Sequence, residues 1–163
     1  MSGTADPRHE MALELFQQAY ILQMQGDLET AADLYKRSIE LFPTAEAYTF
    51  LGWTYNQQGR PDDAIVQCKN AILIDPGFGN PYNDIGAYLI HQGKNGEAIP
   101  WLEKAAASSR YDAYHYPWYN LGRAYAGLEM FTRARECFEK ALEIEPRYPA
   151  AAEALKRIRA AVQ

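Results

Sequence analysis

The sequence predicts an all-α fold made of short helices that pair into hairpins. Two observations support this. Apolar residues recur at the three- and four-residue spacing of a helix face, as at Trp118, Leu121 and Tyr125. A glycine also marks the same place in three successive segments, with spacings of 34 and 36 residues. These marker glycines are Gly52, Gly86 and Gly122. An internal period of this length is typical of proteins built from stacked helix pairs.

Four helix pairs follow from this period, at about residues 12–44, 45–78, 79–114 and 115–148. The first pair is the weakest match, because Ala19 stands where the other three have the marker glycine. We expect a turn inside each pair, marked by a glycine in the first three and by Glu129 in the fourth. The turn glycines are Gly26, Gly59 and Gly93, and the prolines after the second helices are Pro43, Pro76 and Pro146. The segment before the repeats, residues 1–8, is expected to be flexible.

The third pair departs from the pattern in two ways. Pro100 falls one turn into its second helix, where it removes a backbone hydrogen bond, so we expect a slight kink. The closing proline is replaced by the segment 108–110, and the connection to the fourth pair is two residues longer than the others. We expect Tyr111 and Tyr114 in this loop and Trp118 in the core.

Residues 149–163 are predicted to form a terminal capping helix. Pro149 falls in the first turn, where a missing N–H costs nothing. The residues expected on its apolar side are Ala152, Leu155, Ile158 and Val162. A helix with one apolar and one polar face is what the open end of a repeat stack requires.

This pattern resembles the tetratricopeptide repeat, whose signature places a large residue, Leu-Gly, Tyr, Ala, Phe, Ala and Pro at fixed intervals. The fourth segment carries the whole signature, at Trp118, Leu121, Gly122, Tyr125, Ala134, Phe138, Ala141 and Pro146. The resemblance covers almost the whole chain and implies a right-handed α-solenoid, a superhelix whose concave side is lined by the first helix of each pair. It also implies a non-catalytic scaffold or adaptor that binds a peptide segment of a partner protein in the concave groove.

Composition and residue spacing argue against several other functions. The formal net charge of −5 disfavours a nucleic-acid partner, because phosphate binding needs clustered Lys and Arg. No segment is apolar over the roughly 18 residues that a membrane span needs, and the N-terminus lacks a signal-peptide pattern, so we expect a cytoplasmic location. Cys68 and Cys137 are expected to be buried free thiols. The spacing of His, Cys, Asp and Glu indicates neither a group of catalytic residues nor a group of metal ligands. We therefore expect no metal, no cofactor and no enzyme activity.

The resemblance assigns a set of residues on the first helices to the peptide-binding groove. They are Phe16, Tyr20 and Gln23 in the first repeat, Thr49, Trp53 and Asn56 in the second, Asn83 and Ala87 in the third, and Tyr116, Tyr119 and Arg123 in the fourth. Aromatic rings bury a large area at low entropic cost, and amides can satisfy a peptide backbone. A hydrophobic or aromatic-bearing segment is therefore the expected ligand. The alternative is that Tyr20, Trp53 and Tyr119 only fill gaps between helices.

Some tetratricopeptide co-chaperones hold the acidic C-terminal tails of heat-shock chaperones with a clamp of lysines, asparagines and an arginine. The matching places here hold Phe16, Tyr20, Phe50, Asn80 and Asp84, so no such carboxylate clamp is expected. Two alternatives to an adaptor stay open. One is a structural homo-oligomer, and the other is a cytoplasmic relative of bacterial pilus-assembly tetratricopeptide proteins, which the long third junction resembles. The sequence does not identify the partner.

Overall fold

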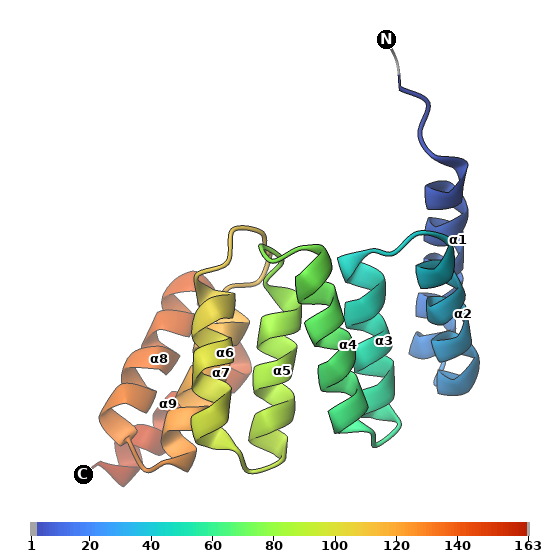
Figure 1. Cartoon of the computed structure of the whole chain (residues 1–163). Coiled ribbons are helices and arrows are strands. Elements are labelled where there is room, and N and C mark those ends of the chain that lie inside the picture. The colour runs from blue at the N-terminus through green and yellow to red at the C-terminus, as the bar shows by residue number, and fades with distance from the viewer. Residues whose placement is uncertain (1–2, 163) are drawn as a thin grey trace. The chain divides into compact units, whose positions relative to one another are not determined.

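The computed structural model describes residues 3–162, and within them the chain forms nine α-helices and no β-strand (Figure 1). The helices are α1 (Pro7–Met24), α2 (Leu28–Leu41), α3 (Ala45–Gln57), α4 (Pro61–Ile74), α5 (Asn80–His91), α6 (Asn95–Ala106), α7 (His115–Gly127), α8 (Phe131–Ile144) and α9 (Pro149–Ala161). The prediction of an all-α fold is confirmed. The helices group into two compact units, the first ending at Pro76 and the second beginning at Gly77.

Helix α1 begins earlier than the sequence analysis predicted. The Asp6 carboxylate accepts a hydrogen bond from the backbone N–H of Arg8 at 2.9 Å, and Pro7 occupies the first turn. An aspartate cap followed by proline is a strong helix start, since it satisfies one free N–H and omits another. Residues 7 and 8 are therefore helical, where a flexible segment was expected. Residues 1 and 2 of that segment lie outside the described residues.

In the first unit, α1 packs on α2, α2 on α3, and α3 on α4. The marker positions lie where paired helices come closest. Ala19 is fully buried, and a Cβ added at Gly52 would lie 2.9 Å from the backbone oxygen of Ala64. Only a very small side chain fits there, which gives the marker its physical meaning.

In the second unit, α5 packs on α6 and α7 on α8, while both α5 and α6 contact α7. The marker glycines work as in the first unit: a Cβ at Gly86 would overlap Leu102, and one at Gly122 would overlap Phe138. Helix α6 runs through Pro100 and continues to Ala106.

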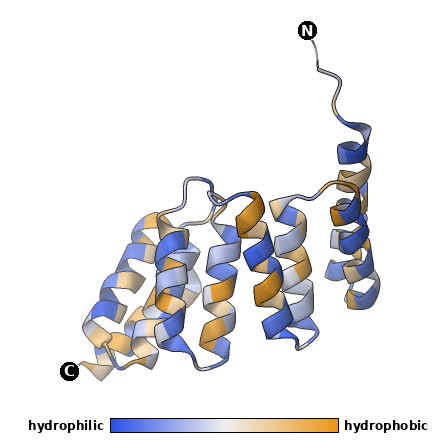
Figure 2. Cartoon of the chain, viewed as in Figure 1, coloured by the Kyte–Doolittle hydropathy of each residue, from blue (hydrophilic) through white to orange (hydrophobic). Residues whose placement is uncertain are grey.

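Helix α9 covers α8, as expected of a capping helix. Leu155 and Ile158 join a core cluster with Phe138 of α8. Two residues predicted on the apolar side are exposed instead, Ala152 and Val162. The buried residues are Ala151, Leu155 and Ile158. The buried face therefore begins at Ala151, one residue before the start of the predicted stripe. The mixture of hydrophobic and hydrophilic residues along each helix is visible in Figure 2.

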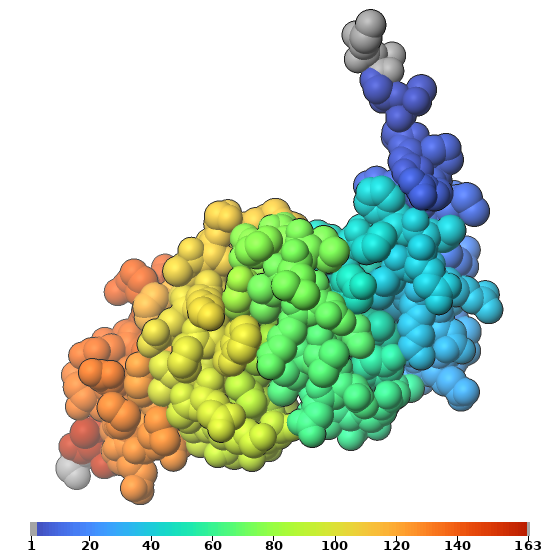
Figure 3. All heavy atoms as spheres, in the orientation of Figure 1, coloured from blue at the N-terminus to red at the C-terminus, as the bar shows by residue number. Residues whose placement is uncertain are grey.

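The long segment between α6 and α7 is fastened to the start of α5. The backbone N–H of Gly79 donates to the oxygen of Arg110, and the N–H of Arg110 donates to the oxygen of Gly77, both at 2.9 Å. The Arg110 guanidinium lies 4.1 Å from the centre of the Phe78 ring. In Figure 3 this yellow to orange segment lies beside the green residues that precede α5. The extra length therefore forms an ordered bridge within the second unit.

Candidate peptide-binding surfaces

The first unit presents four aromatic rings from α1 and α3, which we call the first aromatic surface: Phe16, Tyr20, Phe50 and Trp53. Phe50 lies at its centre, with edge-to-face contacts to Phe16 at 5.2 Å, to Tyr20 at 5.8 Å and to Trp53 at 5.8 Å between ring centres. Tyr20 is 42% exposed and Trp53 is 36% exposed. Rings fixed against one another yet open to solvent can bind an apolar group with little loss of side-chain entropy.

Phe50 belongs to this surface although the sequence pattern did not assign it to the groove. It lies one residue after Thr49, which was assigned to the groove in its place. Thr49 is buried, and its hydroxyl donates to the backbone oxygen of Ala45 at 2.7 Å. The signal that could have identified Phe50 is the repeat period, because Phe50 lies two residues before the marker Gly52.

Gln23 is also buried, although it was assigned to the groove. Its amide oxygen accepts a hydrogen bond from the Tyr35 hydroxyl at 2.7 Å, and its amide nitrogen donates to the side-chain oxygen of Gln57 at 2.6 Å. Burial raises the pKa of Tyr35, which keeps the phenol protonated and able to donate. Gln23 is therefore a structural polar contact. Asn56, from the same predicted set, is partly buried.

The second unit presents its own group of rings, which we call the second aromatic surface: His115, Tyr116, Tyr119 and Tyr148. Tyr148 contacts the other three, at 5.1 Å from His115, 5.6 Å from Tyr116 and 5.2 Å from Tyr119. Tyr116 is 43% exposed, while Tyr119 is partly buried against Phe138. His115 and Tyr148 were not predicted to belong to it. Tyr148 comes from the link between α8 and α9 and not from a first helix.

Two asparagines join α5 to α7. The side-chain nitrogen of Asn120 donates to the side-chain oxygen of Asn83 at 3.0 Å, and the Asn120 oxygen accepts from the Arg123 guanidinium at 3.1 Å. Arg123 also lies 5.9 Å from the centre of the Tyr119 ring. Asn120 thus links Asn83 to Arg123, and Asn83 is only 8% exposed. Ala87 is partly buried.

Asp84 follows Asn83 on α5 and is partly buried. Burial raises the pKa of its carboxyl from 3.8 to about 7. Burial, and then the nearby Asp84 carboxylate, raise the pKa of the Tyr111 hydroxyl. Such a carboxyl stays protonated well above the pH at which an exposed aspartate ionises.

A cavity of about 400 Å³ opens beside Tyr119 and Arg123 in the second unit. Apolar side chains form much of its wall, including Ile90, Phe138 and Ile158. Two predicted groove residues therefore line a hollow that can accept a side chain. Such hollows with apolar walls and few polar groups are typical of ligand sites.

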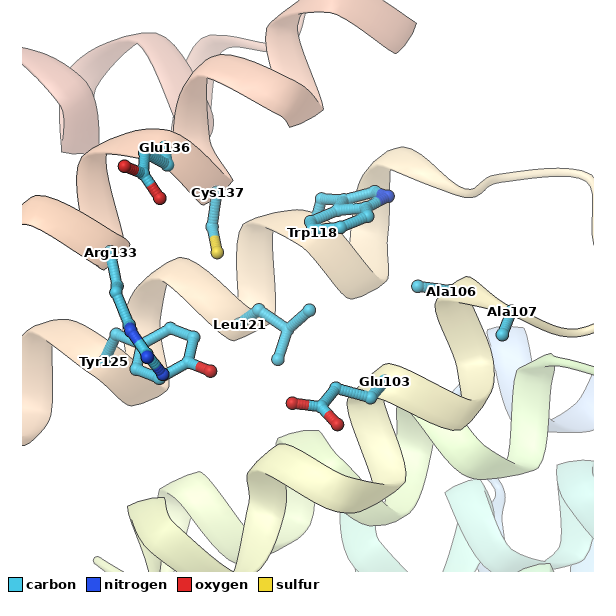
Figure 4. A pocket seen from close by; sticks show the side chains of 9 residues that line it. All are labelled: Glu103, Ala106, Ala107, Trp118, Leu121, Tyr125, Arg133, Glu136 and Cys137. Atoms are coloured by element: carbon cyan, nitrogen blue, oxygen red, sulfur yellow. The ribbon is translucent and has the colours of Figure 1, made fainter.

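A larger cavity of about 600 Å³ lies between α6, α7 and α8 (Figure 4). Trp118, which was expected in the core, lines this cavity and is only partly buried. Cys137 also lines it, and burial raises the pKa of its thiol to about 11, which leaves very little thiolate at neutral pH. At the edge of the cavity, the Arg133 guanidinium lies 5.7 Å from the centre of the Tyr125 ring. The chemistry of this cavity is that of an apolar hollow with charged edges.

Within residues 3–162, no helix is long and apolar enough to cross a membrane. No group of three or more His, Cys, Asp or Glu side chains in the same range is placed to hold a metal ion.

All four helix pairs match models described as tetratricopeptide repeat. One model matches residues 45–78 and 115–148, and two further models match residues 15–45 and 82–110. Together these matches cover most of the chain, and they confirm the sequence-based identification of the repeat.

Two curated relatives match parts of the chain. The small glutamine-rich tetratricopeptide repeat-containing protein 2 of Mycosarcoma maydis is 34% identical over 79 residues, which is 48% of this chain and 22% of the relative. The type IV pilus assembly protein PilF of Pseudomonas aeruginosa is 25% identical over 129 residues, which is 78% of this chain and 51% of the relative. The chain thus spans about half or less of the length of these relatives.

Solved structures confirm the fold class, an α-solenoid of tetratricopeptide repeats. The structure of P. aeruginosa PilF superposes with a TM-score of 0.88 at 23% identity and covers 94% of this chain and 69% of that chain. The first tetratricopeptide domain of Spaghetti (RPAP3), solved with the HSP90 peptide SRMEEVD, superposes with a TM-score of 0.68 at 24% identity. That match covers 73% of this chain and 93% of that chain.

Proposed function

Because the chain belongs to the tetratricopeptide repeat family, we propose that it is a non-catalytic interaction module that binds peptide segments of a partner protein on its two aromatic surfaces. The observation that carries this proposal is the exposure of Tyr20, Trp53 and Tyr116 on the first helices of their repeats. Large rings left open to solvent in a folded unit mark interaction sites more often than an isolated aliphatic residue does.

The character of the ligand follows from the side chains around these rings. The first aromatic surface is built from four rings, so it suits an aromatic or branched apolar side chain. The second aromatic surface adds tyrosine hydroxyls, and Arg123 lies beside Tyr119 with a guanidinium that can donate to peptide oxygens. We therefore propose a hydrophobic or aromatic-bearing segment of a protein, and neither a nucleic acid nor a membrane.

The RPAP3 domain shows that a repeat array of similar fold can hold a peptide. The acidic chaperone tail in that structure is not the ligand we propose here. The places that match the carboxylate clamp hold Phe16, Tyr20, Phe50, Asn80 and Asp84, and none of these is a cation.

The test is affinity capture with the native protein and a triple variant, Tyr20→Ala, Trp53→Ala and Tyr116→Ala. These three rings are at least 36% exposed, so their removal should leave the circular dichroism spectrum and the melting temperature close to native values. A matched control carries Val66→Ala and Leu73→Ala, which remove exposed apolar groups from α4. We expect a protein captured by the native chain and the control to be lost by the triple variant. Equal capture by all three would contradict the proposal.

A second candidate function is participation in type IV pilus assembly. It is favoured by the PilF relative, which aligns with 78% of the chain. Expression of this chain in a P. aeruginosa strain lacking PilF tests it directly. Restoration of assembled pili would support this function, and their continued absence alongside well-expressed protein would count against it.

A self-associating structural oligomer is the remaining alternative. Light scattering over a wide range of protein concentration distinguishes it from a monomeric module. A mass that rises with concentration in the native protein, and not in the triple variant, would mean that the aromatic surfaces bind another copy of the chain.

A further inference from the structure

The cavity of about 400 Å³ in the second unit carries charged side chains of one sign on its wall. Among the described residues that line it, the charged ones are Arg123 of α7 and Arg157 of α9. These two arginines are 34 residues apart, and α7 and α9 also begin 34 residues apart, at His115 and Pro149. Arg123 and Arg157 therefore hold corresponding places on two helices related by the repeat period, and they line the same hollow.

Most of the remaining wall is apolar. Phe138 of α8 and Ile158 of α9 line the cavity and belong to the buried core cluster that these helices share. Tyr119 packs on Phe138, with 5.8 Å between the ring centres. Because the same side chains form the wall and the core, the hollow is present before any ligand arrives. Its volume of about 400 Å³ lies within the usual range of ligand pockets.

Both arginines have N–H groups left for a ligand. Arg123 donates to the side-chain oxygen of Asn120 at 3.1 Å. The Arg157 side chain is 76% exposed, and it pairs with the exposed Glu153 one turn earlier in α9 at 3.5 Å. An exposed pair of this kind contributes little to stability, so Arg157 is free to turn toward an incoming anion. A guanidinium has five N–H donors, which is more than these contacts use.

An anion is the ligand that these donors suit. The formal net charge of −5 does not prevent its approach, because charges more than about 10 Å away are largely screened in 0.1 M salt. The apolar wall suits a hydrophobic side chain beside that anion. Tyr119 also contacts Tyr148 of the second aromatic surface at 5.2 Å, so a bound segment can continue from the cavity onto that surface. This continuity favours a residue within a peptide segment over a free small anion.

We propose that this cavity binds a phenylalanine or leucine side chain of a partner protein while Arg123 and Arg157 bind the carboxylate of an aspartate or glutamate next to it. The inference rests on the peptide-binding function proposed above and adds an acidic residue to the expected segment. A planar guanidinium suits this role because it can bind a carboxylate through two parallel N–H groups. Neither arginine stands at a place that matches the carboxylate clamp, so the site differs from the one expected for an acidic chaperone tail.

The probes for the test are three capped dipeptides. N-acetyl-phenylalanyl-glutamate α-amide carries the proposed pair of side chains, and N-acetyl-phenylalanyl-glutamine amide is its neutral match. N-acetyl-glutaminyl-phenylalanine with a free carboxyl end moves the negative charge to the end of the chain. Each is titrated at pH 7 and low ionic strength into isotopically labelled protein, and two-dimensional NMR spectra report the binding site.

We expect the glutamate peptide to shift signals of Tyr119, Arg123 and Arg157, with a dissociation constant of about 1–10 mM, as is usual for so small a ligand. The other two peptides should bind at least about fivefold more weakly. Equal binding of the glutamate and glutamine peptides would overturn the role of the arginines. Binding of the free-carboxyl peptide as tight as that of the glutamate peptide would overturn the assignment to an acidic side chain.

Two matched variants make the result specific. Arg157→Gln removes a guanidinium from the cavity wall, and Arg135→Gln removes one from α8 that is not part of the wall among the described residues. In the native protein each of these arginines pairs with a glutamate four residues away, at 3.5 Å and 3.7 Å, so the two changes remove similar internal contacts. We expect Arg157→Gln to weaken binding of the glutamate peptide at least about fivefold, and Arg135→Gln to leave it within about twofold of native. Equal affinity in Arg157→Gln, or no shift at the cavity in the native protein, would overturn the inference.

These outcomes are separate from the test of the proposed function, because the triple variant leaves the cavity wall intact. Partner capture that depends on Tyr20, Trp53 and Tyr116, but that Arg157→Gln leaves unchanged, would overturn the acidic site and keep the interaction module. Loss of the captured partner in both the triple variant and Arg157→Gln, with binding of the glutamate peptide at the cavity, would support both proposals.

Discussion

Gln23 and Gln57 are joined by a hydrogen bond of 2.6 Å although 34 residues separate them in the chain. That separation is one repeat period, so the bond links corresponding ends of α1 and α3. Gln23 also accepts from the Tyr35 hydroxyl on α2 at 2.7 Å. One buried amide therefore fixes the second helix of the first repeat and the first helix of the next in a single arrangement.

Replacing Gln23 by alanine should destabilise the first unit. The change leaves the buried hydroxyl of Tyr35 without its acceptor, a loss of about 1–3 kcal/mol in the free energy of unfolding. Denaturation in urea, followed by circular dichroism, measures it. Gln18→Ala, at an exposed position of the same helix, is the control and should change the free energy by less than about 0.5 kcal/mol. Similar values for the two variants would contradict the structural role of Gln23.

The marker glycines lead to a prediction about packing. A methyl group at Gly122 would overlap the Phe138 ring, so Gly122→Ala should lower the free energy of unfolding by about 1–3 kcal/mol through overpacking. Gly96, near the start of α6, has open space where its Cβ would be. Gly96→Ala should be neutral or stabilising by up to about 1 kcal/mol, because alanine restricts the unfolded chain. A thermal melt of both variants checks the contrast, and a neutral Gly122→Ala would show that α7 and α8 can separate.

The sequence was sufficient for the repeats because their period has a steric cause. Small residues recur where paired helices touch, as at Gly52 against Ala64, and a steric constraint of this kind leaves a regular mark in the chain. Helix ends were less predictable, since the start of α1 depends on the local cap made by Asp6. In α9 the apolar stripe had to be chosen among several alanines, and burial selected Ala151 over Ala152.

The candidate surfaces were only partly predictable, because tertiary contacts decide which side chains are exposed on a surface. Tyr20, Trp53 and Tyr116 are exposed at assigned groove positions, whereas the chain buries Thr49 and Gln23. Tyr148 lies outside the repeating positions and reaches the second aromatic surface from the link before α9. Its placement does not follow from helical periodicity.

The two cysteines should be slow to react in the folded protein. Cys68 is fully buried and Cys137 is 7% exposed, and neither forms a disulfide. Burial raises the pKa of Cys137 to about 11, so its thiolate fraction at pH 8 is about 100-fold lower than that of an exposed cysteine. A Cys68→Ser variant isolates Cys137 in a reaction with Ellman's reagent. We expect modification at least about 100-fold slower in buffer than in denaturant, and comparable rates would mean that the cavity of Figure 4 opens readily.

The raised pKa of Asp84 makes the stability of the folded protein depend on pH. The pKa of this carboxyl is 3.8 in an unfolded chain and about 7 in the folded protein. Between these values the folded state binds a proton that the unfolded state has released, so the free energy of unfolding falls as the pH rises from about 4 to about 7. The full loss, at most about 4 kcal/mol, is present above the folded pKa.

Asp84→Asn isolates this contribution from the titration of other groups on that side of the unit, which include Tyr111, His115, Tyr116, Tyr148 and Arg123. An amide has no proton to exchange, so the variant should be more stable than the native protein at pH 8 and differ from it much less at pH 5. Urea denaturation at the two pH values measures the difference, with Asp112→Asn as the control that should follow the native protein at both. A native-to-variant difference that is the same at pH 5 and pH 8 would show that the Asp84 carboxyl is solvated.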